Sequence, residues 1–145
     1  MRPSSRFQYS LKALVDLALH QSTGPVTVAA IARRQGIPVH SLEQLFNRLG
    51  RKGLVKAERG PRGGYRLRRP ADQISVQEIF ELFEAAQGRP AILEKDGAAD
   101  PSHSLWKQVE QAVRTTLTAT TLQVLVDQME ERAVSPIQHR YTFHI

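Results

Sequence analysis

Two short helical patterns stand on either side of a tight turn in the first half of the chain, and this spacing restricts the fold more than any other feature. Thr27 precedes VAAIARRQG, in which Val28 and Ile31 are placed to face inward and Gly36 is placed to end a helix. Pro38 opens VHSLEQLFNRLGRKG, whose apolar residues recur at i, i+3, i+4 and i+7. These residues are Leu42, Leu45, Phe46 and Leu49. Two short helices joined by a glycine-containing turn predict a helix-turn-helix.

A strongly basic hairpin is predicted directly after the second helix. LVKAER and YRLRR have alternating character and are separated by GPRGG, as in two short strands joined by a tight loop. Pro61 fixes φ near −65° and the glycines allow positive φ, so the tip can be narrow. Arg59, Arg62 and Arg66 supply its charge. The alternative is an ordinary surface hairpin whose arginines contact only water. A phosphate-binding loop is not indicated, because its pattern G-x-x-x-x-G-K-[ST] is absent.

The first residues predict one more helix, packed through a single apolar face. In SSRFQYSLKALVDLALHQ the apolar side chains recur at intervals of three and four. They are Phe7, Leu11, Leu14, Val15 and Ala18. Ser4 or Ser5 is placed to cap this helix.

Charge is divided unequally between the two halves of the chain. Residues 1–70 hold 14 Lys and Arg against 3 Asp and Glu, whereas residues 71–145 hold 6 against 11. A basic half joined to an acidic half is typical of a polyanion-binding module attached to a part with another role.

The exposed face of the second helix carries side chains able to hydrogen-bond base edges or phosphates. A helical wheel groups His40, Glu43, Gln44, Asn47 and Arg51 opposite the apolar positions. An ordinary solvated face is the alternative. Because a helix, a helix-turn-helix and a basic hairpin follow one another, we predict a winged helix-turn-helix that binds double-stranded DNA, mainly α with a small β-hairpin.

Three stretches of this sequence resemble the family of bacterial winged-helix regulators that includes IscR, NsrR and CymR. They are SSRFQYSLKALVDLAL, GPVTVAAIARRQGIPVHSLEQLFNRLGRKGLV and RGPRGGYRL, and a weaker resemblance continues to about residue 132. The resemblance implies a homodimer on a roughly palindromic operator, with Glu43 and Gln44 near bases and Arg59 in the minor groove.

Base and phosphate chemistry suggests a role for each candidate side chain. Glu43 can accept from cytosine N4, and Gln44 can pair with adenine through two hydrogen bonds. Arg59 or Arg62 is the candidate for the minor groove, where negative potential is concentrated. Phosphate contacts are expected from Tyr9, Arg48, Arg51 and Lys56. The full set of predicted DNA-binding residues is Ser5, Arg6, Tyr9, Thr27, His40, Ser41, Glu43, Gln44, Arg48, Arg51, Lys56, Arg59, Arg62, Gly63, Gly64 and Tyr65.

The acidic half predicts a capped helix, a loop and a long helix with an uncovered apolar side. Ser75 and Glu78 form a capping box at the start of a helix expected to pack under the wing. Residues 86–103 are expected to form a sensor-type loop, with a helix from Ser104. The apolar side of that helix holds Leu105, Trp106, Val109, Val113 and Leu117. We expect a two-fold partner to cover it, the alternative being a purely intramolecular core.

The absence of cysteine limits the cofactors of this chain. With no cysteine, neither a disulfide nor a cysteine-ligated iron-sulfur cluster can form. Cluster-binding members of the family carry three cysteines in the loop before the long helix and a histidine shortly before an LW pair. Here His103 stands before SLW, and we expect no metal site there. It can be a remnant, a helix-cap contact, or a ligand together with Asp100 or Glu94.

These observations predict four regions: a winged DNA-binding domain over 1–85, the sensor-type loop 86–103, dimerisation helices over 104–132 and a strand-like tail over 133–145. We expect a cytoplasmic transcriptional regulator, acting as a repressor with an effector or partner protein. No run of about 18 apolar residues occurs, so no membrane contact is expected. The alternative function is an adapter that docks a metabolic enzyme or sensor. No catalytic constellation is recognisable, so we expect no enzymatic activity.

Overall fold

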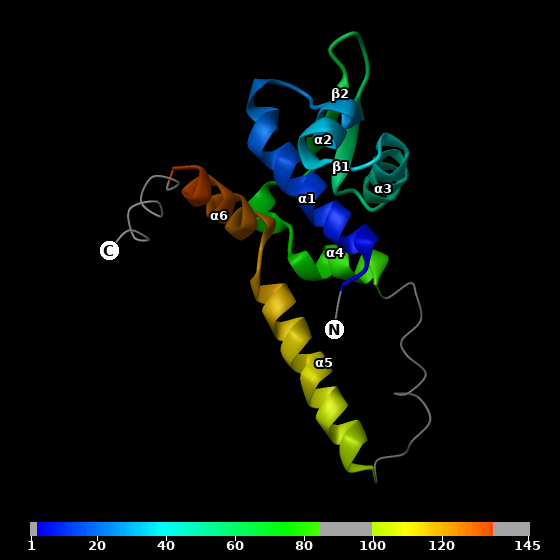
Figure 1. Cartoon of the computed structure of the whole chain (residues 1–145), viewed down its shortest axis with the longest axis vertical. Helices are drawn as coiled ribbons and strands as arrows, with labels where there is room; N and C mark the ends of the chain where they lie inside the picture. The colour runs from blue at the N-terminus through cyan, green and yellow to red at the C-terminus, as the bar shows by residue number, and fades with distance from the viewer. Residues whose placement is uncertain (1–2, 85–99, 135–145) are drawn as a thin grey trace, which may run out of the picture.

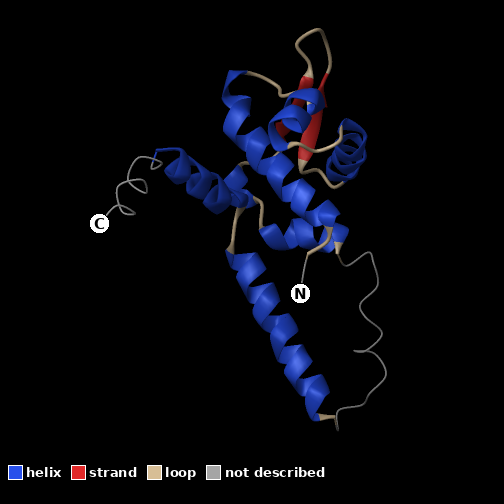
Figure 2. Cartoon of the chain, in the orientation of Figure 1, coloured by secondary structure: helices blue, strands red, loops and turns tan. Residues whose placement is uncertain are grey.

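The structure is a computed structural model that describes residues 3–84 and 100–134. The described residues are mainly helical, and their only sheet is one antiparallel hairpin (Figure 2). The helices are α1 (Ser5–His20), α2 (Val28–Gln35), α3 (Val39–Arg51), α4 (Val76–Phe83), α5 (Pro101–Ala119) and α6 (Leu122–Val134). The strands are β1 (Val55–Glu58) and β2 (Gly64–Leu67), and short 3-10 turns cover Gln21–Thr23 and Ala71–Gln73. The predicted fold class is confirmed.

Helix α1 lies at the centre of the domain and contacts α2, α3, α4, α6 and β2 (Figure 1). Ser4 begins it, because its hydroxyl accepts a hydrogen bond from the backbone N–H of Phe7 at 3.2 Å. The buried face includes Phe7, Leu14 and Val15. This central position explains why most of one side of α1 is apolar.

The helix-turn-helix has the predicted start and stop signals. Thr27 caps α2 by accepting from the N–H of Ala30 at 3.1 Å, and Gly36 ends it with a φ of 64°. Only glycine adopts that left-handed conformation without strain. Helix α3 then buries the four apolar residues predicted for its inner face, namely Leu42, Leu45, Phe46 and Leu49.

Helix α4 begins with the predicted capping box but packs elsewhere than expected. Ser75 Oγ accepts from the N–H of Glu78 at 3.3 Å, and the Glu78 carboxylate accepts from the N–H of Ser75 at 3.0 Å. The main partners of α4 are α1 and α5, not the hairpin. The prediction that α4 lies under the wing was therefore wrong. Helix α4 packs against the part of α1 that lies away from the hairpin (Figure 1).

Helix α5 starts three residues earlier than predicted and projects away from the winged domain (Figure 1). Asp100 caps it by accepting from the N–H of Ser102 at 2.9 Å, and Pro101 occupies its first turn. Proline fits there because the first N–H groups of a helix have no partner within it. Residues 101–103 therefore belong to the helix, while residues 86–99 of the predicted loop and the predicted strand in the tail lie outside the described residues.

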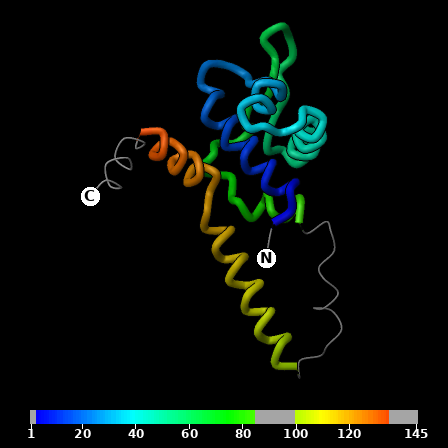
Figure 3. Tube along the Cα trace, viewed as in Figure 1, coloured from blue at the N-terminus to red at the C-terminus, as the bar shows by residue number. Residues whose placement is uncertain are grey.

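Helix α6 returns to the winged domain, as the continuous trace in Figure 3 shows. Thr121 begins it, with its hydroxyl accepting from the N–H of Val124 at 3.3 Å. Leu122 and Val126 are buried in the core. Backbone hydrogen bonds also tie the α5–α6 junction to the start of α4, with Val76 donating to Thr120 and Leu122 to Ile74. The two C-terminal helices thus differ, since α5 projects and α6 packs on α1.

A buried carboxylate fixes α2 against α1. The side chain of Asp16 is 1% exposed and accepts three hydrogen bonds from Arg34, the shortest at 2.6 Å, and one from Gln35 at 2.8 Å. Arg33 and Arg34 are adjacent in the sequence and both exposed. They differ in that the Arg34 guanidinium is held by Asp16.

Arg34→Ala is expected to reduce the free energy of unfolding by about 2 kcal/mol, because it leaves the Asp16 carboxylate buried without its cation. We place the loss near the lower end of the range for such pairs because the Arg34 side chain is 36% exposed. Arg33→Ala is the matched control, since it removes the same charge from the next position and should change stability by less than about 0.5 kcal/mol. Urea unfolding measures both, and equal losses would show that the Asp16 contact is not stabilising.

Candidate nucleic-acid interface

Helix α3 exposes the polar face that the sequence predicts. His40, Glu43, Gln44, Asn47 and Arg51 are all exposed, while the opposite side of the helix enters the core. One hydrogen bond joins two of these side chains, with 3.2 Å between the side-chain nitrogen of Gln44 and Nε2 of His40. No other side-chain partner occurs for Glu43 or Gln44 within the described ranges. Helix α3 therefore presents a set of free donors and acceptors.

The glycines of the wing are required by close backbone contacts. The turn between β1 and β2 is closed by the N–H of Gly63 donating to the carbonyl of Gly60 at 2.9 Å. A Cβ at Gly63 would meet the carbonyl oxygen of Glu58 at 2.5 Å. At Gly64 it would meet the carbonyl oxygen of Val26, also at 2.5 Å. Gly63 and Gly64 therefore act through the shape of the wing, whether or not they approach DNA.

Gly64→Ala is expected to lower the free energy of unfolding by about 2 kcal/mol, because the new methyl group collides with the backbone of Val26 and φ at this position is +155°. The two hydrogen bonds between Val26 and Tyr65 would lengthen or break. Gly50→Ala in α3 is the control, since its Cβ would meet nothing closer than 3.9 Å, and alanine is the better helix former. Thermal and urea unfolding should show opposite signs for the two variants, and a neutral Gly64→Ala would contradict the steric argument.

An aromatic contact joins the wing to α3. The rings of Phe46 and Tyr65 lie 4.7 Å apart between centroids, with planes tilted by 46°. Val26 pairs with Tyr65 in an isolated bridge, so strand β2 is also attached to the segment before α2. Tyr65, predicted to bind DNA, thus packs within the protein. The contacts of Tyr65 therefore fix the position of the hairpin relative to α3.

The charge of the wing tip comes from fewer arginines than the sequence suggested. Arg59 and Arg62 are exposed and have no side-chain partner in the described part of the chain. Arg66 instead forms an ion pair with Glu58 at 2.7 Å and donates to the carbonyl of Gln21 at 3.1 Å. Two free cations therefore remain at the tip, while Arg66 fastens β2 to β1 and to the turn after α1.

Arg48 is placed away from the free cations. Its guanidinium donates to the carbonyl of Leu82 at 3.0 Å and lies 5.0 Å above the ring of Phe83. This contact ties α3 to the last turn of α4, where the carbonyl groups of a helix lack partners. Arg48 was predicted to bind phosphate, and no observation tests this; because one of its donors and the face of its guanidinium are engaged with α4, we leave it out of the candidate surface.

The remaining predicted DNA-binding residues lie on α1, α2, α3 and β1. Ser5, Arg6, Thr27, Arg51 and Lys56 are exposed, whereas Tyr9 and Ser41 are half-buried. Thr27 uses its oxygen lone pair to cap α2, which leaves its O–H free to donate to a phosphate. These side chains come from elements that contact one another, since α3 packs on α1, α2 and β1.

Sequence analysis missed the contribution of Gln21 to the wing. Its side-chain oxygen accepts from the N–H of Leu67 at 2.9 Å, and its backbone carbonyl accepts from Arg66. Gln21 therefore acts as an additional pairing residue along β2. A glutamine in the turn after a helix carries no local signal of this role, because its partners lie 45 and 46 residues away.

The residues present do not fit a cysteine-ligated metal centre. The chain contains no cysteine, and the described ranges contain no group of three or more His, Asp or Glu able to hold a metal ion. Nδ1 of His103 is buried and has no hydrogen-bond partner within the described residues, but one nitrogen atom alone does not make a metal site. Both Asp100 oxygens are used by Ser102, whose hydrogen bonds lower the pKa of the Asp100 carboxyl. Asp100 is a helix cap; Glu94, the other suggested partner of His103, lies outside the described residues.

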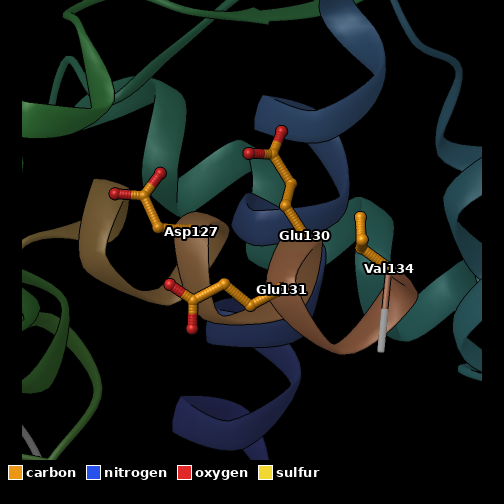
Figure 4. A pocket seen from close by; sticks show the side chains of 4 residues that line it. All are labelled: Asp127, Glu130, Glu131 and Val134. Carbon is orange, nitrogen blue, oxygen red and sulfur yellow. The ribbon is translucent and has the colours of Figure 1, made fainter. Parts of the chain in front are cut away.

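The surface of α6 has the opposite charge to the wing. Asp127, Glu130 and Glu131 line an open hollow together with Val134, and Figure 4 shows the three carboxylates along the same helix. Carboxylates repel phosphates, so this surface is excluded as a DNA contact. None of the helices in the described ranges combines the length and apolarity needed to cross a bilayer.

Comparison with known proteins gives consistent matches over most of the chain. Residues 3–128 match the family Rrf2, described as "Iron-dependent Transcriptional regulator". The chain is 37% identical to the HTH-type transcriptional regulator IscR of Klebsiella pneumoniae (strain 342), covering 97% of this chain and 89% of the relative. Among solved structures, it resembles IscR of T. potens with a TM-score of 0.79 and 33% identity, covering 91% of this chain and 90% of that one. CymR of B. subtilis, titled a global cysteine regulator, gives a TM-score of 0.78 and 32% identity, covering 88% and 98%.

Proposed function

Since this chain belongs to the Rrf2 family of transcriptional regulators, we propose that it binds a roughly palindromic operator as a homodimer and acts as a repressor. It is a DNA-binding winged-helix regulator and not an enzyme. One observation carries the proposal. The exposed polar face of α3 and a wing tip with two free arginines belong to elements joined by the Phe46–Tyr65 contact.

Within this surface, we assign base recognition to α3 and shape recognition to the wing. Glu43 is proposed to accept from cytosine N4 and Gln44 to pair with adenine. Arg59 or Arg62 is proposed to enter the minor groove. The proposed phosphate contacts are Ser5, Arg6, Tyr9, Thr27, Ser41, Arg51 and Lys56.

The proposed dimer contact is the apolar side of α5. None of its residues is fully buried in the single chain, although Leu117 packs against the core, and Leu105 and Trp106 are 57% and 51% exposed. Large apolar side chains grouped on a projecting helix are typical of a protein interface. A two-fold axis through such an interface would match the symmetry of a palindromic site.

Regulation is proposed to depend on a small effector or a partner protein in the cytoplasm, without a cysteine-ligated cluster. The absence of a cysteine-ligated cluster follows from the sequence, because the chain has no cysteine to supply thiolate ligands. We propose residues 1–85 as the DNA-binding region and α5 as the dimerisation element, with residues 86–99 as the sensor segment. The adapter function considered above is not favoured by the regulators that the chain resembles.

The experiment that tests this function is enrichment of genomic DNA fragments by the purified protein, followed by fluorescence anisotropy at several salt concentrations. Binding through phosphate contacts predicts a slope of about −0.9 in log K against log salt for each phosphate neutralised. Enriched fragments should share an inverted repeat. Affinity that depends on neither salt nor sequence would refute the function.

A further inference from the structure

Val39, the first residue of α3, is the one large apolar side chain that the described part of the winged domain leaves exposed. It is 44% exposed, whereas the other large apolar side chains exposed in the described ranges lie on α5 and α6. The buried face of α3 is formed without it. A single exposed valine is common on protein surfaces, but this one lies at the start of the recognition helix.

Val39 lies beside Glu43 on the surface of α3. Residues four positions apart are rotated by only about 40° around a helix axis, and their Cβ atoms are about 6 Å apart. Glu43 is exposed and belongs to the polar face that is proposed to enter the major groove. Recognition helices place the residues of their N-terminal part against base edges. Val39 therefore borders the surface that is proposed to read the operator.

The chemistry of valine restricts what this side chain can recognise. It has no hydrogen-bond donor or acceptor, so it cannot read the amino, oxo or ring-nitrogen groups of the bases. In the major groove thymine presents an apolar group, its C5-methyl, which apolar side chains contact. Packing of Val39 against this methyl group would remove both from water, which is favourable.

We propose that Val39 is a specificity-determining residue that packs against the C5-methyl group of one thymine in each half-site. The inference rests on the proposed function, since it requires α3 to lie in the major groove. Burying one methyl group corresponds to roughly fourfold in affinity per half-site. Because a base-pair step is about 3.4 Å, the thymine should lie one or two base pairs from the pair read by Glu43.

The first step of the test locates the thymine. Each thymine of one operator half-site is replaced in turn by deoxyuridine, which lacks the C5-methyl group but keeps every hydrogen-bonding group. Wild type should lose roughly fourfold in affinity at one of these positions. The base pair read by Glu43 is the one whose preference disappears in Glu43→Ala on a library of single base changes, and it should be the neighbour of that thymine.

The second step measures the ratio of affinities for the thymine and deoxyuridine operators in variants of Val39. Val39→Ser removes both methyl groups and should bring the ratio close to 1, whereas Val39→Ile keeps the apolar surface and should retain the wild-type ratio. A hydroxyl that contacts phosphate alters both affinities alike, so it cancels. Val124→Ser is the matched control, since Val124 is 41% exposed on α6 and should leave the ratio unchanged.

The outcomes separate this inference from the function on which it rests. If wild type selects operators but no thymine near the Glu43 pair responds to deoxyuridine, or if Val39→Ser keeps the wild-type ratio, the role of Val39 is overturned and the proposed function stands. Failure of wild type to prefer any sequence would instead refute the proposed function. Circular dichroism should show the same helical content for the variants, because residue 39 is exposed.

Discussion

Replacing Arg59 and Arg62 together by alanine is expected to weaken binding to each operator half-site by about 100-fold at 0.1 M salt. Both side chains are exposed at the tip of the wing, and neither has a partner among the described residues. If each neutralises one phosphate or enters the minor groove, the slope of log K against log salt should fall by about 1.8 for a half-site and by about 3.6 for the homodimer on the full operator, because each subunit loses two cations. Fluorescence anisotropy of labelled operator between 50 and roughly 400 mM salt measures both quantities.

A matched control distinguishes the wing from net charge alone. Lys107→Ala with Arg114→Ala removes the same two positive charges from the projecting helix α5, where both side chains are exposed. This control should change affinity less than threefold, since its charges lie outside the proposed surface. If the two double variants weaken binding equally, long-range charge and not the wing provides the affinity.

A single substitution separates phosphate contact from insertion into a groove. Arg59→Lys keeps the positive charge but replaces the planar guanidinium by a strongly hydrated ammonium. If Arg59 enters the minor groove, this variant should lose preference for narrow-groove, A·T-rich flanks while keeping the salt dependence. Arg62→Lys is the comparison on the other side of the turn.

The fold was largely predictable because its start and stop signals are local. Ser4 and Thr27 lie within three residues of the N–H groups they cap. Gly36 ends α2 by its own conformation, and the inner face of α3 follows from helical periodicity alone. Such features depend on short stretches of chain, so the sequence is sufficient to find them.

The roles of individual basic residues were not predictable in this way. Arg34, Arg48 and Arg66 look like free surface cations in the sequence, yet each donates to a group 18 or more residues away. Whether an arginine is free depends on which carboxylates and carbonyls the folded chain brings near it. The candidate surface therefore contains fewer cations than the charge count suggests, and the DNA contact that we propose depends more strongly on Arg59 and Arg62.

The packing partners of α4 were not predictable for the same reason, since they depend on which elements the fold brings together. Its apolar stripe identifies which side is buried but not against which element. Its contacts with α1 and α5 depend on packing against segments that are not adjacent to it in the sequence.

Placing glutamate at both Leu105 and Trp106 is expected to convert the protein to a monomer and to weaken binding to the full palindrome by about 1000-fold. The two side chains are more than half exposed in the single chain, so the subunit itself does not need them for its core. Two linked half-site contacts gain a factor of about 100 to 10,000 over a single one, and a monomer loses that gain. Sedimentation velocity measures the mass, and anisotropy on full and half operators measures the affinities.

Retained half-site binding identifies the cause of this loss. Affinity for an isolated half-site should stay within about threefold of wild type, because the surface of α3 and the wing is unchanged. Gln111→Glu with Thr118→Glu adds the same charge to the other side of α5 and should leave both mass and affinity unchanged. A Leu105→Glu, Trp106→Glu protein that remains a dimer would place the interface elsewhere. One that loses half-site binding as well would show that the projecting helix supports the fold of the winged domain and not its pairing.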